Sequence, residues 1–297
     1  MKKIIKNAIS LVCAVCMVAS VAVLSGCGNS ESTPNQGKLS TETNKAGNCS
    51  WSYAEDTKTL SISGNGDMDD YANGSELPWH GYSDTATFVV IEDGVTSIGK
   101  NAFFNFSKLE SITISDSVKT IGDSAFVKCE KLVEISIPDS VEKIGDSAFM
   151  CCYALSSVTL PKGFTEIGKS VFYSCSSLST VDIPSTVTKI GKSAFYNCTS
   201  LTDIIIPSNV EKIEQWAFYN CSSLKSIEVP ASVTKLGKMV FEKCSALTAV
   251  SFKGDAPSIG EGVFNEVKAD ISYPKGNTTW TNDIIQQYGG EITWKEI

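Results

Sequence analysis

The sequence contains no arginine and a single histidine, His80, and its formal net charge is −8. Lysine and arginine side chains neutralise the phosphates of nucleic acids, and arginine reads the edge of guanine. An acidic chain without arginine is poorly suited to both tasks. We therefore expect no nucleic-acid partner.

The single histidine also restricts the chemistry that the chain can perform. Ser–His pairs and histidine metal sites need a histidine beside a second functional group. His80 follows Trp79 and has no second histidine and no cysteine cluster near it in the sequence. We interpret His80 as structural, and we predict a protein that is not an enzyme and carries no metal or cofactor.

One acidic stretch has the spacing of a calcium-binding loop. The side chains at loop positions 1, 3, 5, 7, 9 and 12 would be those of Asn65, Asp67, Asp69, Tyr71, Asn73 and Glu76. Position 6 of such loops needs glycine for a sharp turn, and here it is Asp70. No helical pattern flanks the stretch, so we favour solvated turn residues over a calcium site.

Residues 1–26 are typical of a secretory signal, because lysines precede an apolar run over residues 8–24. The small residues before Cys27 resemble a bacterial lipoprotein cleavage box. This resemblance implies cleavage before Cys27 and attachment of lipid to it, which would hold the chain at a membrane. An uncleaved transmembrane anchor is the alternative, since the run is slightly shorter than a full span.

Residues 27–47 are rich in Ser, Thr, Asn and Gly and lack aromatic residues, which predicts a flexible tether. Residues 48–91 read as an N-terminal cap. Residues 51–53 and 60–63 alternate apolar and polar side chains and predict a β-hairpin. Residues 88–91 return to a strand pattern and join the frame of the repeats that follow.

A repeat of 23 residues occupies residues 92–267. Its skeleton is I-G-x-x-A-F-x-x-C-x-x-L-x-x-[IV], and the Ile-Gly pair or a variant of it recurs at Ile98, Ile121, Ile144, Ile167, Ile190, Ile213, Leu236 and Ile259. A strict period of this size is typical of a solenoid. The sequence therefore predicts about eight stacked coils, closed by caps at both ends.

Residues 132–154 form one complete repeat unit and represent the other coils. The predicted inward columns start from Leu132, Ile135, Ile137, Val141, Ile144, Ala148, Phe149 and Cys152. The Ile-x-Ile spacing predicts a short strand, and proline follows it in five coils. Gly145 is expected at a corner whose backbone other residues resist. The Ala-Phe-x-x-Cys spacing predicts a short helical turn.

The pattern L-x-x-[IV]-x-[IV]-P-x-x-V-x-x-I-G-x-x-A-F-x-x-C resembles the BspA-type bacterial leucine-rich repeats. The resemblance extends into the cap, through the stretch around Leu60 and Ile62 and through Pro78-Trp79. It implies a leucine-rich repeat solenoid at the bacterial cell surface that is used in adhesion, and it brings no catalytic residues. Residues 268–297 then read as a C-terminal cap with strands at 271–273 and 292–294 and a helix over 279–288.

Cysteines form one column of the repeat, at Cys129, Cys152, Cys175, Cys198, Cys221 and Cys244. Neighbouring coils would hold their Cβ atoms about 4.8 Å apart, which exceeds the distance in a disulfide. We expect buried free thiols that act as small hydrophobic side chains. Cys49 and Cys151 lie outside this column and are the candidates for reactive thiols.

The candidate binding residues come from the column after the phenylalanine. This column contains Tyr173, Tyr196 and Tyr219, and Trp216 replaces a serine one turn away. Tyrosine and tryptophan are enriched among the anchors of binding surfaces, and their rings could equally stack on sugars. The alternative is that these rings only pack against neighbouring coils.

Together these features predict a monomeric lipoprotein, secreted and lipid-anchored at the bacterial cell envelope and facing outward. Its solenoid would bind a macromolecular partner, namely a host or microbial surface protein. Binding of a glycan or cell-wall polysaccharide through the aromatic column is the alternative.

Overall fold

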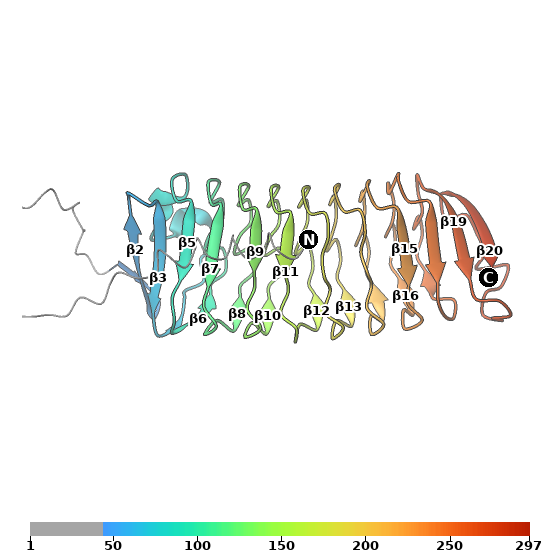
Figure 1. The fold of residues 1–297 in the computed structure, drawn as a ribbon, viewed down its shortest axis with the longest axis horizontal. Helices are drawn as coiled ribbons and strands as arrows, with labels where there is room; N and C mark the ends of the chain where they lie inside the picture. Colours follow the sequence, from blue (N-terminus) through green and yellow to red (C-terminus); the bar gives the residue numbers. More distant parts are fainter. Residues whose placement is uncertain (1–43) are drawn as a thin grey trace, which may run out of the picture. The chain divides into compact units, whose positions relative to one another are not determined.

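Residues 44–297 form stacked coils of about 23 residues each in the computed structural model, and only these residues are described (Figure 1). The predicted leucine-rich repeat solenoid is therefore confirmed. The signal at residues 1–26, the lipid-anchor residue Cys27 and most of the predicted tether lie outside the described residues. Within residues 44–297, no helix is long and apolar enough to cross a membrane.

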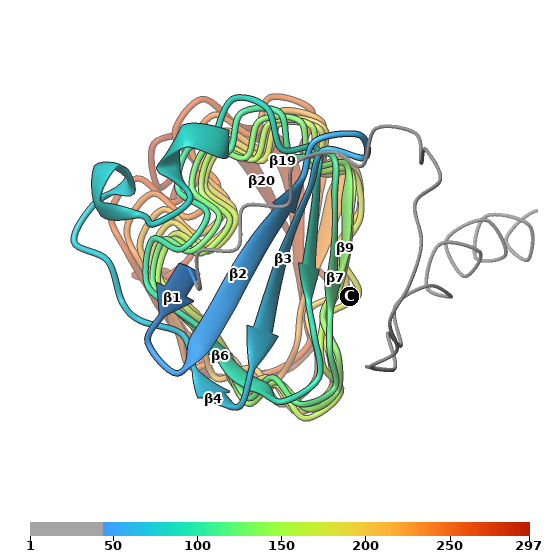
Figure 2. The same ribbon diagram turned by 90° about the vertical axis from the view of Figure 1, so that its left-hand side faces the viewer.

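The coils contribute strands to two sides of the solenoid, although the coils of residues 178–223 have none on the long-strand side apart from the bridge of Asp182 to Thr159. On the long-strand side run β3 (Thr59–Gly64), β5 (Phe88–Ile91), β7 (Ser111–Ile114), β9 (Glu134–Ser136), β11 (Ser157–Thr159), β15 (Ser226–Val229), β17 (Ala249–Phe252), β19 (Lys268–Tyr273) and β20 (Glu291–Glu296). On the short-strand side run β4 (Gly66–Asp67), β6 (Val95–Ile98), β8 (Thr120–Ile121), β10 (Lys143–Ile144), β12 (Glu166–Ile167), β13 (Lys189–Ile190), β14 (Lys212–Ile213), β16 (Lys235–Leu236) and β18 (Ser258–Ile259). Figure 2 shows successive coils nearly superimposed when viewed from the N-terminal end of the stack.

The 23-residue period sets the register between the coils. Ile144 pairs with Ile121, Val158 with Ile135 and Ile190 with Ile167, all in parallel. Because the repeats contain no insertion, every residue lies beside its equivalent one coil away. Identical side chains therefore form columns along the solenoid.

The core consists of these columns. The phenylalanine rings from Phe103 to Phe264 stack with centroids 5.3–6.0 Å apart and nearly parallel planes. The predicted inward residues of the unit at 132–154 are all at most 5% exposed, which confirms those columns. At the N-terminal end Trp79 is fully buried and stacks on Phe103, so it closes the phenylalanine column.

The N-terminal cap contains the predicted hairpin, in which β2 (Cys49–Ala54) pairs antiparallel with β3. β1 (Asn44–Ala46) adds a further antiparallel strand to β2. It lies inside the segment predicted as tether, so the folded part begins earlier than the sequence indicated. Strand pairing uses backbone groups, and a short polar segment can pair without an apolar pattern. Two short 3₁₀ turns follow, η1 (Gly74–Glu76) and η2 (His80–Tyr82).

The predicted helical turn of each coil is wrong in detail. In the unit at 132–154, Ser147 and Cys151 have positive φ angles of 58° and 61°. The backbone amides of this segment alternate between two kinds of hydrogen bond. The amides of Ser147, Phe149 and Cys151 donate to carbonyls of the next coil at 2.8–3.0 Å. The amides of Ala148, Met150 and Cys152 donate to carbonyls three residues earlier in the same coil. The segment is thus a pair of tight turns. The i, i+3 spacing is common to a helical turn and to such turns, so the spacing could not separate them.

The corner glycine was predicted for its backbone freedom, and this reason is also wrong. Gly145 is not among the residues with positive φ. A Cβ atom at Gly145 would instead lie 2.6 Å from the carbonyl carbon of Gly122 on the preceding coil. At Gly145 the glycine is explained by this close approach of the preceding backbone; Gly168 has no such backbone contact nearer than 3.8 Å, and Glu214 occupies the same column in a later coil.

The C-terminal cap has the two predicted strands but not the helix over 279–288. β19 and β20 pair in parallel and enclose the predicted strand residues. The segment between them is a series of turns in which the amide of Ile285 donates to Thr281. Ile284 and Ile285 are partly buried against the core, and Gly276 and Gly289 take positive φ angles at either side. Their apolar spacing therefore reflects one buried turn and not a helix.

Candidate functional site: an aromatic ledge on the turn side

Tyr173, Tyr196, Tyr219 and Trp216 lie together on the turn segments of three consecutive coils, and we call them the aromatic ledge. The ring centroids of Tyr173 and Tyr196 are 4.5 Å apart, and those of Tyr196 and Tyr219 are 4.4 Å apart. Their planes differ by only 5° and 6°. All four side chains are half-buried.

The tyrosines stack because they occupy one column at equivalent positions of adjacent coils. Their ring faces therefore pack on one another, as the packing alternative requires, while part of each side chain stays exposed. Burial raises the pKa of Tyr196, and the neighbouring Tyr219 and Tyr173 phenols raise it further. The Tyr196 phenol is neutral at physiological pH, as an ordinary phenol is, so it can donate a hydrogen bond.

Trp216 lies in a column that otherwise favours small polar residues. Its φ angle is 60°, and Met239, one coil further, has a φ of 55°. The equivalent residues on the preceding coils include Asn101, Ser147 and Ser193. A left-handed backbone costs about 1–2 kcal/mol for most residues and less for asparagine. A bulky aromatic residue held there is a feature that functional sites often show.

Two lysines lie over the aromatic rings. The Nζ atom of Lys192 is 5.0 Å from the Trp216 ring centroid, and that of Lys243 is 5.3 Å from the Tyr219 centroid. These are cation–π distances. The pKa of Lys243 is raised, chiefly by its side-chain hydrogen bond with Tyr219. The indole Nε1 of Trp216 donates to the Met239 sulfur at 3.1 Å.

A pocket of about 380 Å³ lies beside the ledge. It is lined by Tyr173, Ser193, Tyr196, Trp216, Tyr219, Met239 and Glu242. Glu242 follows the tyrosines in their column, and its Oε2 atom is buried without a hydrogen-bond partner. The structure thus brings together all four residues predicted from the sequence and adds three lining residues, Ser193, Met239 and Glu242.

The sequence-based site did not include Glu242, Met239, Lys192 or Lys243. A signal for Met239 was present, because it is the second bulky residue in the column of Trp216. The lysines belong to other columns. Their approach to the rings depends on side-chain conformations that a repeat alignment does not contain.

The cysteine column is buried as expected. All six thiols are fully buried and free. Each Sγ atom donates to a phenylalanine carbonyl 26 residues earlier, at 3.1–3.3 Å. Burial raises the pKa of at least Cys129, Cys175, Cys198 and Cys221. Cys49 and Cys151 are also buried, at 1% and 9% exposure, which speaks against either one as an accessible reactive thiol.

Residues of the calcium-loop pattern make hydrogen bonds within the protein. The Asp67 carboxylate accepts from the Thr96 hydroxyl at 2.6 Å, and the Asp70 carboxylate accepts from the Lys100 amide at 2.6 Å. Asn73 caps η1 by accepting from the Ser75 amide. The Asp67 and Asp70 carboxylates thus tie the cap to the first coil. His80 begins η2, and its side chain is exposed.

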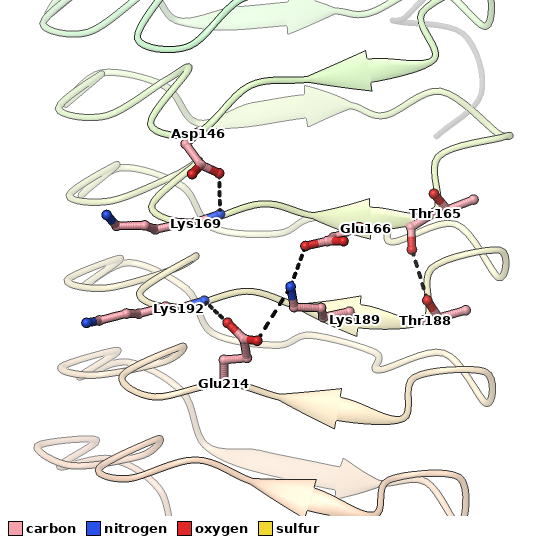
Figure 3. Close-up of polar contacts among 8 residues, drawn as sticks. All are labelled: Asp146, Thr165, Glu166, Lys169, Thr188, Lys189, Lys192 and Glu214. Atoms are coloured by element: carbon pink, nitrogen blue, oxygen red, sulfur yellow. Dashed lines mark hydrogen bonds and ion pairs between the residues drawn. The ribbon is translucent and has the colours of Figure 1, made fainter.

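The short-strand side carries a polar network that links coils (Figure 3). Lys189 Nζ lies 2.6 Å from the Glu166 carboxylate and 3.5 Å from that of Glu214. Glu214 also accepts from the Lys192 amide at 3.1 Å, and Asp146 accepts from the Lys169 amide at 3.0 Å. Here carboxylates bind backbone amides of an adjacent coil, so the network has a structural role.

Parallel coils with repeated apolar columns define the leucine-rich repeat class of solenoids. The family model described as "BspA type Leucine rich repeat region" matches residues 81–198 and 165–288. The chain belongs to this family. The comparison with curated proteins gives no match.

Two solved structures have a similar fold. One is the leucine-rich repeat protein of T. pallidum, with 24% identity and a TM-score of 0.51 over 85% of this chain and 98% of that one. The other is a leucine-rich cell surface protein of Faecalibacterium prausnitzii A2-165, with 23% identity and a TM-score of 0.52 over 89% of this chain and 96% of that one. At these identities the similarity concerns the fold alone.

Proposed function

We propose that the protein is a bacterial cell-surface lipoprotein that binds a macromolecular partner through the aromatic ledge. The ledge is the observation that carries this proposal. Tyrosine and tryptophan concentrate at the centres of binding surfaces, and here three adjacent coils present them half-buried beside a pocket. Membership of the BspA-type family and the likeness to a protein described as a cell surface protein support the location.

The lead candidate for the partner is a host or microbial surface protein, bound by a monomer with no cofactor and no catalysis. A solenoid presents an extended surface that suits a macromolecule. A glycan is the second candidate. The Oε2 atom of Glu242, which has no hydrogen-bond partner, favours a glycan because sugar hydroxyls can donate hydrogen bonds.

A binding screen tests the proposal. The full-length chain in detergent would be tested against arrays of glycans and of matrix and bacterial surface proteins, beside a variant with Trp216→Ser. The proposal expects at least one partner whose binding is weakened about tenfold or more by the variant. If Trp216→Ser leaves binding unchanged, the binding site lies outside the aromatic ledge.

The lipid anchor needs its own experiment. Cells expressing the chain would be grown with a clickable fatty-acid analogue, and the protein would be isolated and probed for label. We expect labelling of the wild type and none of a Cys27→Ser variant. Equal labelling of both would exclude Cys27 as the anchor, and an unlabelled wild type that stays in the membrane would favour an uncleaved transmembrane segment.

A further inference from the structure

The pocket beside the ledge has a shape defined by a change of side chain between two coils. Ser193 and Trp216 occupy the same position in consecutive coils and both line the pocket. A small side chain thus precedes a large one, which leaves a step next to the indole ring. Tyr196 and Tyr219 also line the pocket.

Glu242 lines the pocket and carries an acceptor that the protein leaves unpaired. The Oε2 atom of Glu242 is buried and has no hydrogen-bond partner. Leaving a buried charged acceptor unsatisfied costs free energy. A ligand that donates an O–H or N–H group to this oxygen would recover that cost, whereas a purely apolar side chain would not.

The surrounding charges disfavour ligands that carry a charge of either sign. The ammonium groups of Lys192 and Lys243 lie 5.0 and 5.3 Å from the Trp216 and Tyr219 centroids. A cationic ligand on these rings would be repelled by both ammonium groups, whereas a neutral ring displaces the Lys192 ammonium without that repulsion. An anionic ligand would meet the Glu242 carboxylate within the same pocket. The groups that remain favoured are neutral and rich in hydroxyls.

We infer that the pocket is a subsite for one ring of a neutral sugar within a glycan. The C–H face of the sugar lies on the Trp216 ring in place of the Lys192 ammonium. One sugar hydroxyl donates to the Glu242 carboxylate, whose buried Oε2 atom turns toward the pocket when the sugar binds, and others accept from the displaced lysine and from tyrosine hydroxyls. This inference rests on the proposed binding function of the ledge and names the chemical class of its ligand.

Three sugars of similar size test the charge argument. The full-length chain in detergent would be titrated with N-acetylglucosamine, glucosamine and glucuronate, followed by saturation-transfer NMR. We expect the neutral sugar to bind at least about tenfold more tightly than the cationic and the anionic sugar. Equal binding of all three, or no neutral sugar bound here or on a glycan array, overturns the inference.

Variants assign the binding to the pocket. Trp216→Ser places in this coil the residue of the preceding one and should weaken binding by about tenfold or more. Glu242→Gln should weaken binding of the neutral sugar several-fold and reduce the discrimination against glucuronate, which a purely structural role would not change. Tyr153→Ala removes an exposed tyrosine that does not line the pocket and should bind as the wild type does.

The outcomes separate this inference from the function on which it rests. A chain that binds no sugar but binds a protein in a Trp216-dependent way overturns the sugar subsite and leaves the ledge as the binding surface. A chain that binds neither in a Trp216-dependent way overturns both. Sugar binding unchanged by Glu242→Gln overturns the role given to the buried carboxylate.

Discussion

Glycine recurs at the corner of most coils, directly after the buried isoleucine of the short strand. At Gly145 the reason is the approach of the preceding coil, since an added Cβ atom would lie 2.6 Å from Gly122 C. Real Cβ atoms do not come so close to a backbone carbon, so any larger residue must push two coils apart. The absence of a Cβ atom at Gly145 thus allows the two coils to lie at their observed separation at this corner.

Gly145→Ala is therefore expected to lower the free energy of unfolding by about 1–3 kcal/mol, the usual range for overpacking. Gly163→Ala is the matched control, because a Cβ atom at this exposed glycine meets nothing within 4 Å. We expect the control to change stability by less than about 0.5 kcal/mol. Urea denaturation followed by circular dichroism measures both variants, and equal effects would contradict the steric explanation.

The buried thiols predict how stability depends on pH. Burial raises the pKa of Cys129, Cys175, Cys198 and Cys221 above the ordinary value of 9.0. The unfolded chain therefore loses these protons first as the pH rises. The contribution of these thiols to the free energy of unfolding is fully present below pH 9.0. Above pH 9.0 it is lost at about 1.4 kcal/mol per pH unit for each thiol.

We accordingly expect the free energy of unfolding, measured in reducing buffer, to fall steeply between pH 9 and pH 10. Tyrosine ionises mainly above this window. Cys198→Ala should reduce the slope by about one thiol's share, although it also lowers stability at neutral pH. A free energy of unfolding that is constant from pH 8 to pH 10 would contradict the assigned burial.

At the scale of elements, the coils are tied by polar contacts as well as by the core. Lys189 lies between Glu166 and Glu214 on the short-strand side, and its side chain is only 33% exposed. Lys162 also pairs with an acid, Asp139, but its side chain is 89% exposed. Exposed ion pairs contribute little to stability because water and salt screen them.

Lys189→Ala should therefore destabilise the solenoid by about 0.5–1 kcal/mol at low salt, and Lys162→Ala by close to zero. The effect of Lys189→Ala should shrink in about 1 M salt, where charges are screened within roughly 3 Å. Thermal unfolding at two salt concentrations measures this difference. If both variants lose the same stability at low salt, exposure does not decide the strength of these pairs.

The elements also show which parts of the fold the sequence could predict. The strands and the inward columns follow from periods of 2 and 23, so Ile135, Ile144 and Phe149 were placed correctly. The tight turns at Ser147 and Cys151 were not, because serine and cysteine do not reveal a left-handed backbone that hydrogen bonds to the next coil impose. The turns at residues 279–288 were also predicted wrongly, as a helix, because the two isoleucines there pack against the core from a turn and their spacing does not distinguish a turn from a helix.

The candidate site was predictable only in part, for a related reason. Equivalent positions of adjacent coils are neighbours, so the repeat alone brought the tyrosines together and Trp216 beside them. The pocket additionally depends on Lys192, Lys243 and the carboxylate of Glu242. These side chains reach across columns, and their contacts follow from rotamers and local charge that a linear pattern does not specify.

For the solenoid as a whole, repeated residues and variable residues have separate tasks. The repeated columns bury the core and set the register, whereas the aromatic ledge interrupts the repeat at Tyr173, Tyr196, Trp216 and Tyr219. If function resides in these departures, replacing them by the residues of other coils should remove binding and preserve the fold. The chain itself supplies suitable replacements, methionine from Met150 and serine from Ser193.

The most direct measurement compares binding by the wild type with binding by one variant that combines Tyr173→Met, Tyr196→Met, Trp216→Ser and Tyr219→Met. Both full-length chains would be tested on the same glycan and protein arrays, with melting temperatures recorded. We predict a melting temperature lowered by no more than about 5–10 °C, which corresponds to a few kcal/mol, and loss of every partner that the wild type binds. A folded variant that keeps the wild-type partners would contradict the account.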